Sequence, residues 1–154
     1  MTEDTDTSGG RIVVGVDGTA TSPPAVRWAV QEALLRGASL HLIFVRRRYQ
    51  RAPYSGMAED QLRGDDDAAG NSLMAAARQQ ASQTLPMSQL VTELADGSPA
   101  KVLIDRSVGA ELLVLGSAYP PGLPVGEGTP VIGAVARACL QSAACPVVIV
   151  ATSS

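Results

Sequence analysis

Short runs of apolar residues recur along the chain and alternate with segments in which apolar residues repeat every three or four positions. Apolar runs of about four to eight residues that are rich in β-branched side chains are typical of strands buried on both faces of a parallel sheet. The periodic segments are typical of helices with one buried face. The runs predict strands at residues 11–16, 39–45, 90–94, 112–115 and 147–150. The periodic segments predict helices at residues 22–36, about 65–84, 98–107 and 130–143.

Several of these helices carry the residues that commonly start and stop a helix. Ser22 is a favourable N-cap residue, and Pro23 after it suits the first helical position. Ser98 and Pro99 repeat this pair. Gly37 follows the last apolar position of the first helix, where a glycine commonly ends a helix. The first helix is therefore expected to lie between Ser22 and Gly37.

The segment from Arg46 to Gly70 shows no clear period. It contains Pro53 and Gly64, so we expect a long loop. Three consecutive carboxylates at 65–67 are placed near the start of the next helix, where negative charge is favourable.

The alternation of strands and helices predicts an α/β fold. We expect an open, doubly wound, five-stranded parallel sheet that is Rossmann-like, with strand order 3-2-1-4-5 and four helices. Residues 1–10 are polar and acidic and are expected to form a disordered tail, followed by one domain at 11–151. If the first and fourth strands are neighbours, the turn at 17–19 faces Gly116 and Ser117 across one crevice.

Composition narrows the classes of function. The 154 residues are 45% hydrophobic but only 3% aromatic, and the net charge is −3. A mildly acidic chain offers no long-range attraction to nucleic acid or to an anionic membrane, and we expect neither partner. No apolar run reaches the length of a membrane span, and the first ten residues lack the features of a signal peptide, so the expected location is the cytoplasm. Cys139 and Cys145 are expected to be reduced.

Two strand ends carry candidate chemistry. Asp17 ends the first strand, where a carboxylate can accept hydrogen bonds from a ribose or an adenine, or bind a metal; the alternative is a turn carboxylate. Val45 ends the second strand, where its backbone can pair with an adenine edge; the alternative is a core residue.

The basic residues give weaker indications of a functional site. Arg46–Arg48 and Arg51 form a cluster after the second strand that either neutralises phosphates or belongs to a solvated loop. His41, the only histidine, lies inside a predicted strand and is read as a core or boundary residue. Lys101, the only lysine, is far from any glycine-rich turn, which excludes a P-loop.

Five segments, taken in order, resemble the universal stress protein family. The resemblance covers roughly residues 11–150, and each segment alone is a weak match. The first is an opening strand and turn, the third is a helix start, and the others are the second, fourth and fifth strands. They lie at residues 12–19, 40–45, 96–100, 112–117 and 145–150.

The resemblance also implies a site. Nucleotide-binding members of the family carry a Gly-x2-Gly-x9-Gly-Ser/Thr motif after the fourth strand. Here Gly116 matches the first glycine, Tyr119 replaces the second, and either Gly133–Ala134 or, in another register, Gly128–Thr129 matches the final pair. In the first register the hydroxyl is missing. The nucleotide-binding residues expected in that register are Asp17, Gly18, Thr19, Val45, Gly116, Ser117, Gly133 and Ala134.

The function implied is a regulatory module of a stress response. It is expected to bind ATP or another, smaller adenine nucleotide, with or without Mg²⁺, in a partly degraded pocket. The alternative is a homodimeric interaction protein of the same fold that binds no nucleotide. Either form is expected to dimerise through the apolar edge strand at 147–150. No catalytic or metal-binding residue is assigned, because the glycine-rich loop has no cation and Glu127 is its only acid, so we do not expect an enzyme.

Overall fold

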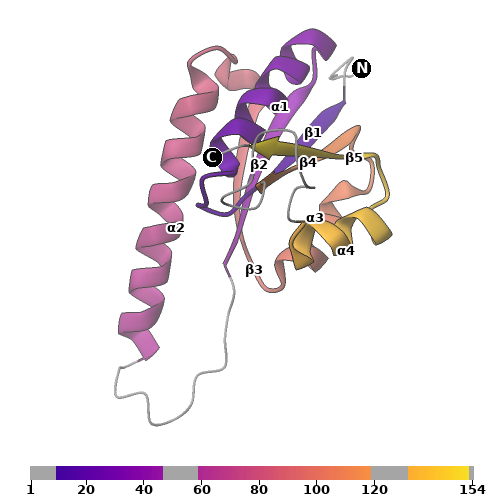
Figure 1. Ribbon diagram of the computed structural model, residues 1–154. Coiled ribbons are helices and arrows are strands. Elements are labelled where there is room, and N and C mark those ends of the chain that lie inside the picture. The colour runs from indigo at the N-terminus through magenta and orange to yellow at the C-terminus, as the bar shows by residue number, and fades with distance from the viewer. Residues whose placement is uncertain (1–9, 47–58, 119–131, 153–154) are drawn as a thin grey trace, which may run out of the picture.

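The computed structural model describes residues 10–46, 59–118 and 132–152, with the backbone alone at 59–67. Strands and helices alternate along these residues (Figure 1). The strands are β1 (Arg11–Val16), β2 (Ser39–Arg46), β3 (Leu90–Asp96), β4 (Leu112–Ala118) and β5 (Val147–Thr152). The helices are α1 (Ser22–Arg36), α2 (Glu59–Ser82), the short 3-10 helix η2 (Met87–Gln89), α3 (Pro99–Ser107) and α4 (Ala134–Ser142).

The strands form one parallel sheet in the order β3-β2-β1-β4-β5, which confirms the predicted topology. β1 is central and pairs with β2 on one side and β4 on the other. The chain thus runs from the centre to one edge and then crosses to the other side. The strand order reverses between β1 and β4, and ligands in open α/β sheets bind at such a reversal.

Helices cover both faces of the sheet. Helices α1 and α2 pack on the face that carries Ile12 and Val14, whereas α3 and α4 pack on the face that carries Val13. Successive residues of a strand point to opposite faces, so both faces of β1 are buried. This explains the continuous apolar run in the sequence. A fully buried aliphatic side chain stabilises the fold by about 1.5–3 kcal/mol relative to an exposed one.

The prediction of a loop from Arg46 to Gly70 was wrong, because α2 begins at Glu59. The segment 59–69 is rich in good helix formers, and Gly64 did not end the helix. Gly70 is buried on the face that contacts β2, where an added Cβ would lie 3.0 Å from the ring of Phe44. This second glycine of α2 therefore allows close packing of the helix on β2.

Two helix starts also differ from prediction. The N-cap of α1 is Thr21, not Ser22, and its side chain makes no capping hydrogen bond. The hydroxyl of Ser22 is instead bonded to Asp17. Helix α4 begins at Ala134 rather than at residue 130, with Gly133 as the N-cap in an extended conformation. Residue 130 itself lies outside the described residues.

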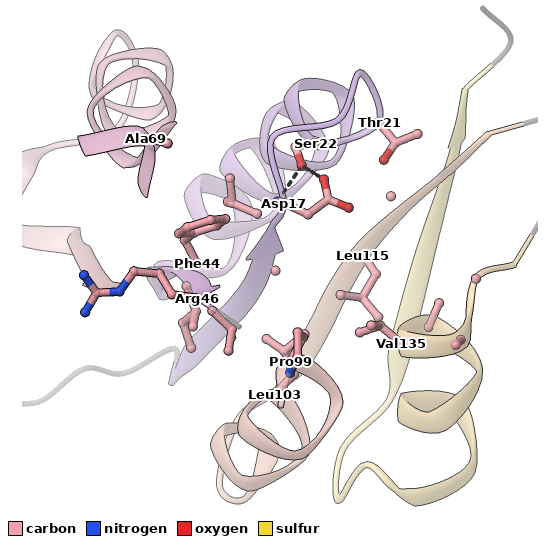
Figure 2. A pocket seen from close by; sticks show the side chains of 18 residues that line it. Asp17, Thr21, Ser22, Phe44, Arg46, Ala69, Pro99, Leu103, Leu115 and Val135 are labelled. Atoms are coloured by element: carbon pink, nitrogen blue, oxygen red, sulfur yellow. Dashed lines mark hydrogen bonds between the residues drawn. The ribbon is translucent and has the colours of Figure 1, made fainter. Parts of the chain in front are cut away.

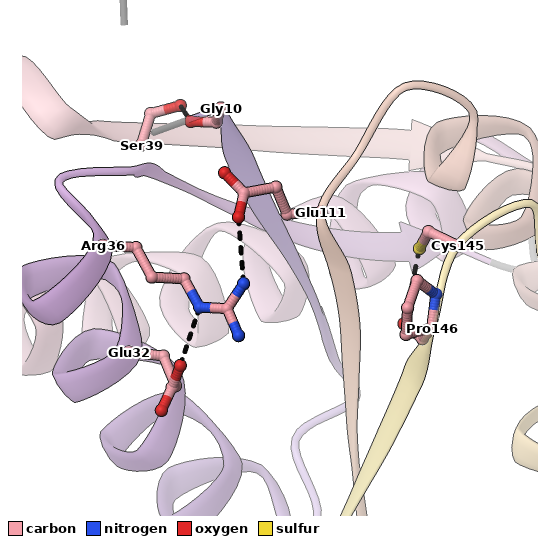
Figure 3. Close-up of polar contacts among 7 residues, drawn as sticks. All are labelled: Gly10, Glu32, Arg36, Ser39, Glu111, Cys145 and Pro146. Carbon is pink, nitrogen blue, oxygen red and sulfur yellow. Dashed lines mark hydrogen bonds and ion pairs between the residues drawn. The ribbon is translucent and has the colours of Figure 1, made fainter. Parts of the chain in front are cut away.

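The amino-terminal edge of the sheet is held by polar contacts (Figure 3). The guanidinium of Arg36, at the end of α1, contacts the carboxylates of Glu32 at 2.8 Å and Glu111 at 2.9 Å. At the start of β5, the thiol of Cys145 donates to the carbonyl of Pro146 at 3.5 Å.

Cys139 and Cys145 are both free thiols, and burial raises the pKa of each. None of the helices in the described ranges is both long and apolar enough to span a membrane.

Candidate functional site

A cavity of about 520 Å³ opens where β1, β2 and β4 end (Figure 2). It lies at the reversal of strand order, between the end of β1 and the starts of α3 and α4. Its volume falls in the range of pockets that hold small organic ligands. We call two of its sides the carboxylate wall, formed by Val16, Asp17, Thr21 and Ser22, and the helix wall, formed by Gly133, Ala134, Val135 and Ala136.

The carboxylate wall is organised around one oxygen atom of Asp17. Its Oδ1 accepts hydrogen bonds from the backbone N–H of Thr19 at 2.9 Å and the hydroxyl of Thr19 at 2.7 Å. It also accepts a hydrogen bond from the hydroxyl of Ser22 at 2.8 Å. The same hydroxyl of Ser22 accepts from the backbone N–H of Asp17 at 3.0 Å. The carboxylate is therefore fixed before any ligand arrives.

These contacts also set the charge of Asp17. Partial burial raises the pKa of the carboxyl group, but the hydrogen bonds from Thr19 and Ser22 outweigh it, and the net pKa lies below the ordinary value. Asp17 is consequently an anion at neutral pH. Because Ser22 is itself buried, its two bonds are shielded from competition by water.

Close contacts hold the turn after β1 against its neighbours. At Gly116 in β4, an added Cβ would lie 2.4 Å from the carbonyl oxygen of Thr21. At Gly18, where φ is +80°, it would lie 2.9 Å from the side chain of Leu73 in α2. The position that a side chain would take at Gly116 is therefore occupied by the backbone of Thr21, and Gly116 also lines the cavity.

The middle of the cavity is mostly apolar. Ile43, Phe44 and Val45 come from β2, and Pro99 and Leu103 of α3 lie below Phe44 in Figure 2. The pairing of β2 with β1 ends at Phe44, whereas its pairing with β3 continues for two more residues. Val45 thus lies one residue beyond the last pair with β1. The apolar lining of this part of the cavity is well suited to a flat apolar ring.

The cationic side chain of Arg46 lies at the β2 end of the cavity. Nε of Arg46 lies 2.9 Å from Oδ1 of Asp96, its register partner in β3, and Nη2 of Arg46 lies 3.3 Å from Oδ2. The stem of the Arg46 side chain lines the cavity while its guanidinium points away from the centre (Figure 2). The positive charge of Arg46 is therefore matched by a carboxylate of the protein.

The helix wall presents backbone rather than side-chain polar groups. Gly133 and Ala134 are exposed, and the first N–H groups of α4 have no partner within the helix. Such groups carry a partial positive charge and favour anions. Ala134 provides no hydroxyl group. This wall can therefore contribute N–H donors and a helix dipole, but no charged side chain.

The structure brings together five of the eight residues predicted in the first register. Three others do not line the cavity: Gly18 and Thr19 belong to the turn that supports Asp17, and Ser117 is buried in β4. Gly128 and Thr129 lie outside the described residues, as do Tyr119 and the arginines at 47, 48 and 51. The five that line the cavity are Asp17, Val45, Gly116, Gly133 and Ala134.

Sequence reasoning missed several lining residues. Ser22 was interpreted as a helix cap, and its role as the support of Asp17 depends on a turn geometry that its spacing does not reveal. Pro99 could have been found, because the helix start that it marks must lie at the carboxyl edge of the sheet. Arg46 was noted only as part of a basic cluster. Leu103, Leu115 and Val135 looked like ordinary core residues.

The family model described as the universal stress protein family matches residues 10–151. The chain belongs to the universal stress protein family. Two curated universal stress proteins from strains of Mycobacterium tuberculosis are each 31% identical to it over 143 residues. These alignments cover 90% of this chain and 47% of each relative, so this universal stress protein spans about half the length of the curated relatives it matches.

Solved structures of the family share the fold. Universal stress protein UspA from Lactobacillus plantarum superimposes with a TM-score of 0.73 at 21% identity, covering 94% of this chain and 99% of UspA. A universal stress protein in complex with cAMP gives 0.65 at 22% identity, covering 94% and 98%. Members from Archaeoglobus fulgidus with dAMP and from Arabidopsis thaliana with AMP give 0.59 and 0.61, at 20% and 16% identity. They cover 91% and 92% of this chain, and 96% and 91% of their own.

Proposed function

We propose that this universal stress protein binds an adenine nucleotide, ATP or a smaller one, in the cavity between β1 and β4. It would act as a regulatory module of a cytoplasmic stress response. The observation that supports this most is the meeting of Asp17 and Gly116, 99 positions apart in the sequence, at one cavity of ligand size. The complexes of family members with cAMP, dAMP and AMP make adenine the first base to test.

Each part of an adenine nucleotide finds suitable chemistry in this cavity. We place the base in the apolar part of the cavity, which Val45 and Leu103 both line, with its edge toward the backbone of Val45. Asp17 has a second carboxylate oxygen that can accept hydrogen bonds from ribose hydroxyls. The N–H groups at the start of α4 face the phosphate. Mg²⁺, if present, would be carried by the nucleotide rather than by a dedicated set of protein ligands.

We further propose that the bound nucleotide is a signal and not a substrate. Efficient phosphoryl transfer uses a cationic clamp and a base beside the transferred group. From Ser107 to Ala136 the sequence contains no lysine, arginine or histidine. Any hydrolysis of ATP would therefore be slow and incidental.

A homodimer through β5 is the second proposal. β5 lies at an edge of the sheet, and its first four residues are apolar. An apolar edge strand is a template for pairing, and pairing with a second copy would cover it. If no nucleotide binds, this contact leaves an interaction protein of the same fold. Sedimentation equilibrium tests it: a dimer is expected, and a monomer at concentrations of about 100 µM would contradict it.

Calorimetric titration with ATP, AMP and cyclic AMP, each with and without Mg²⁺, tests nucleotide binding. We expect saturable binding of at least one of the three with one site per chain. Dissociation constants in the millimolar range for all three, or no binding, would contradict the proposal and favour the interaction protein.

A matched pair of variants locates the site. Ala69 lines the cavity from α2, whereas Ala76 is exposed further along the same helix and does not. Ala69→Trp should fill the β2 end of the cavity and weaken binding at least about tenfold, or about 1.4 kcal/mol. Ala76→Trp should leave binding unchanged. Equal effects of the two substitutions would place the nucleotide elsewhere.

A further inference from the structure

The charges around the cavity are distributed unevenly. On the carboxylate wall, Oδ1 of Asp17 is held by three hydrogen bonds, from two groups of Thr19 and from Ser22. No residue in the described ranges bonds Oδ2 of Asp17. A fixed anion with one open acceptor therefore faces the cavity. It attracts hydroxyl and N–H donors and repels any phosphate brought near it.

Among the described residues that line the cavity, Arg46 is the only one with a cationic side chain. The sequence has no lysine, arginine or histidine between Ile12 and Val26 or between Ser107 and Ala136, a range that includes the whole loop after β4. The cation at the β2 end, Arg46, is paired with Asp96. At the helix wall, a phosphate chain would meet backbone N–H groups, and a helix N-terminus carries about half an elementary charge.

We infer that this cavity selects adenine ligands of low phosphate charge, so that adenosine and AMP bind more tightly than ATP. The inference rests on the proposed nucleotide site. Its physical basis is that each phosphate added to the ligand adds negative charge, whereas the one cation among the described lining residues, Arg46, is already paired with Asp96. The net charge of −3 on the chain acts in the same direction.

The salt dependence of binding has a diagnostic sign. A protein that binds the triphosphate through lysine and arginine side chains loses affinity for ATP when salt screens the attraction between those side chains and the phosphates. Here the dominant long-range term for ATP is repulsion, so screening should bring ATP affinity closer to that of AMP. Adenosine carries no phosphate charge, and its affinity should be nearly independent of salt.

The experiment is a calorimetric titration of the full chain with adenosine, AMP and ATP in EDTA. It is run at ionic strengths of about 0.01 M and about 1 M, where the Debye lengths are about 30 Å and 3 Å. At the lower ionic strength, ATP should bind roughly tenfold more weakly than AMP, and at the higher one within about threefold. ATP binding as tightly as AMP at low salt, or weakening relative to AMP as salt rises, would overturn the inference and leave the proposed function intact. Absence of binding by all three ligands would overturn both.

Two lysine substitutions on α4 provide a gain-of-function test. Ala134 is exposed at the helix wall, whereas Gln141 is exposed near the other end of the same helix and does not line the cavity. Ala134→Lys should raise ATP affinity about tenfold more than AMP affinity, because the new cation faces the phosphates. Gln141→Lys adds the same net charge and should change the two affinities by less than about threefold each. Equal responses of ATP to the two variants would contradict the inference.

Asp17→Asn provides the complementary test. The amide oxygen can still accept bonds from Thr19 and Ser22, but the negative charge is removed. The ratio of ATP to AMP affinity should rise by about threefold to tenfold at low ionic strength. An unchanged ratio in a variant that keeps its wild-type circular dichroism spectrum would contradict the assigned role of Asp17. If this variant unfolds, the Ala134→Lys and Gln141→Lys pair still decides the question.

Discussion

The carboxylate wall and the helix wall face the same cavity but are built differently. The carboxylate wall is held by a network in which the hydroxyl groups of Thr19 and Ser22 both donate to Oδ1 of Asp17. The helix wall offers only the first turn of α4, which starts at Ala134. The polar groups of the carboxylate wall thus already have partners within the protein, whereas the N–H groups of the helix wall need a ligand as their partner. A site of this kind can keep its place in the fold while its choice of ligand changes.

The contrast is sharpest at two glycines that line the cavity. At Gly116 an added side-chain atom would lie 2.4 Å from a backbone oxygen of Thr21, whereas at Gly133 nothing lies within 4 Å. Gly116→Ser should lower the free energy of unfolding by about 1–3 kcal/mol, because backbone has to shift. Gly133→Ser places a favourable N-cap residue on α4 and should change stability by less than about 1 kcal/mol. Urea denaturation of both variants checks this, and equal losses would refute the asymmetry.

The buried hydroxyl that supports the carboxylate wall gives the next largest effect. Ser22→Ala removes a donor to Asp17 and leaves the backbone N–H of Asp17 without its acceptor. The expected loss is about 1–3 kcal/mol in the free energy of unfolding. Ser142→Ala, at the exposed end of α4, should cost less than about 0.5 kcal/mol. A Ser22→Ala variant as stable as Ser142→Ala would mean that the network does not hold the turn.

Restoring a hydroxyl to the helix wall should have a smaller effect, and on binding alone. Ala134→Ser adds one donor for a phosphate oxygen at the start of α4, and a hydrogen bond to a charged group contributes about 1.5 kcal/mol at the low end. AMP affinity should rise by up to about tenfold, measured by calorimetry, with the unfolding midpoint unchanged. No gain in affinity would show that phosphate does not approach this turn.

The pH dependence of stability gives the smallest expected effect. Hydrogen bonds keep the pKa of folded Asp17 below that of an unfolded aspartate, which is about 3.9. Its stabilising contribution is therefore fully present above that pH and is lost as the pH falls through the folded pKa. The stability advantage of the wild type over Asp17→Asn should shrink between pH of about 6 and about 2.5, measured by urea denaturation. An advantage that grows on acidification would contradict this.

Much of the fold could be predicted because its strands are buried on both faces. The run at Arg11–Val16 and its counterparts are too apolar for an exposed element, and their alternation with helical segments leaves few topologies. The start of α2 could not be predicted, since glycines usually interrupt helices, yet Gly64 and Gly70 both lie within α2 and Gly70 packs against Phe44. Tertiary contact overrode local preference at that position.

The candidate site likewise has features that the sequence predicts and features that it does not. Asp17 and Val45 were predictable from their positions at strand ends, which share one edge of a parallel sheet. The bond between Ser22 and Asp17 was not, because both residues have ordinary local explanations as cap and turn. The pairing of Arg46 with Asp96 depends on the register of β2 with β3, which a single sequence does not provide.

The most direct test of a nucleotide site at the β1–β4 reversal is a titration of the ¹⁵N-labelled protein with AMP, followed by backbone amide chemical shifts. Shifts should be largest at Asp17, Val45 and Gly116 and in the first turn of α4, and negligible at Gly109 beside the amino-terminal edge of β4. Saturating shifts confined to these residues would support the site. Shifts centred elsewhere, or none at millimolar AMP, would contradict it.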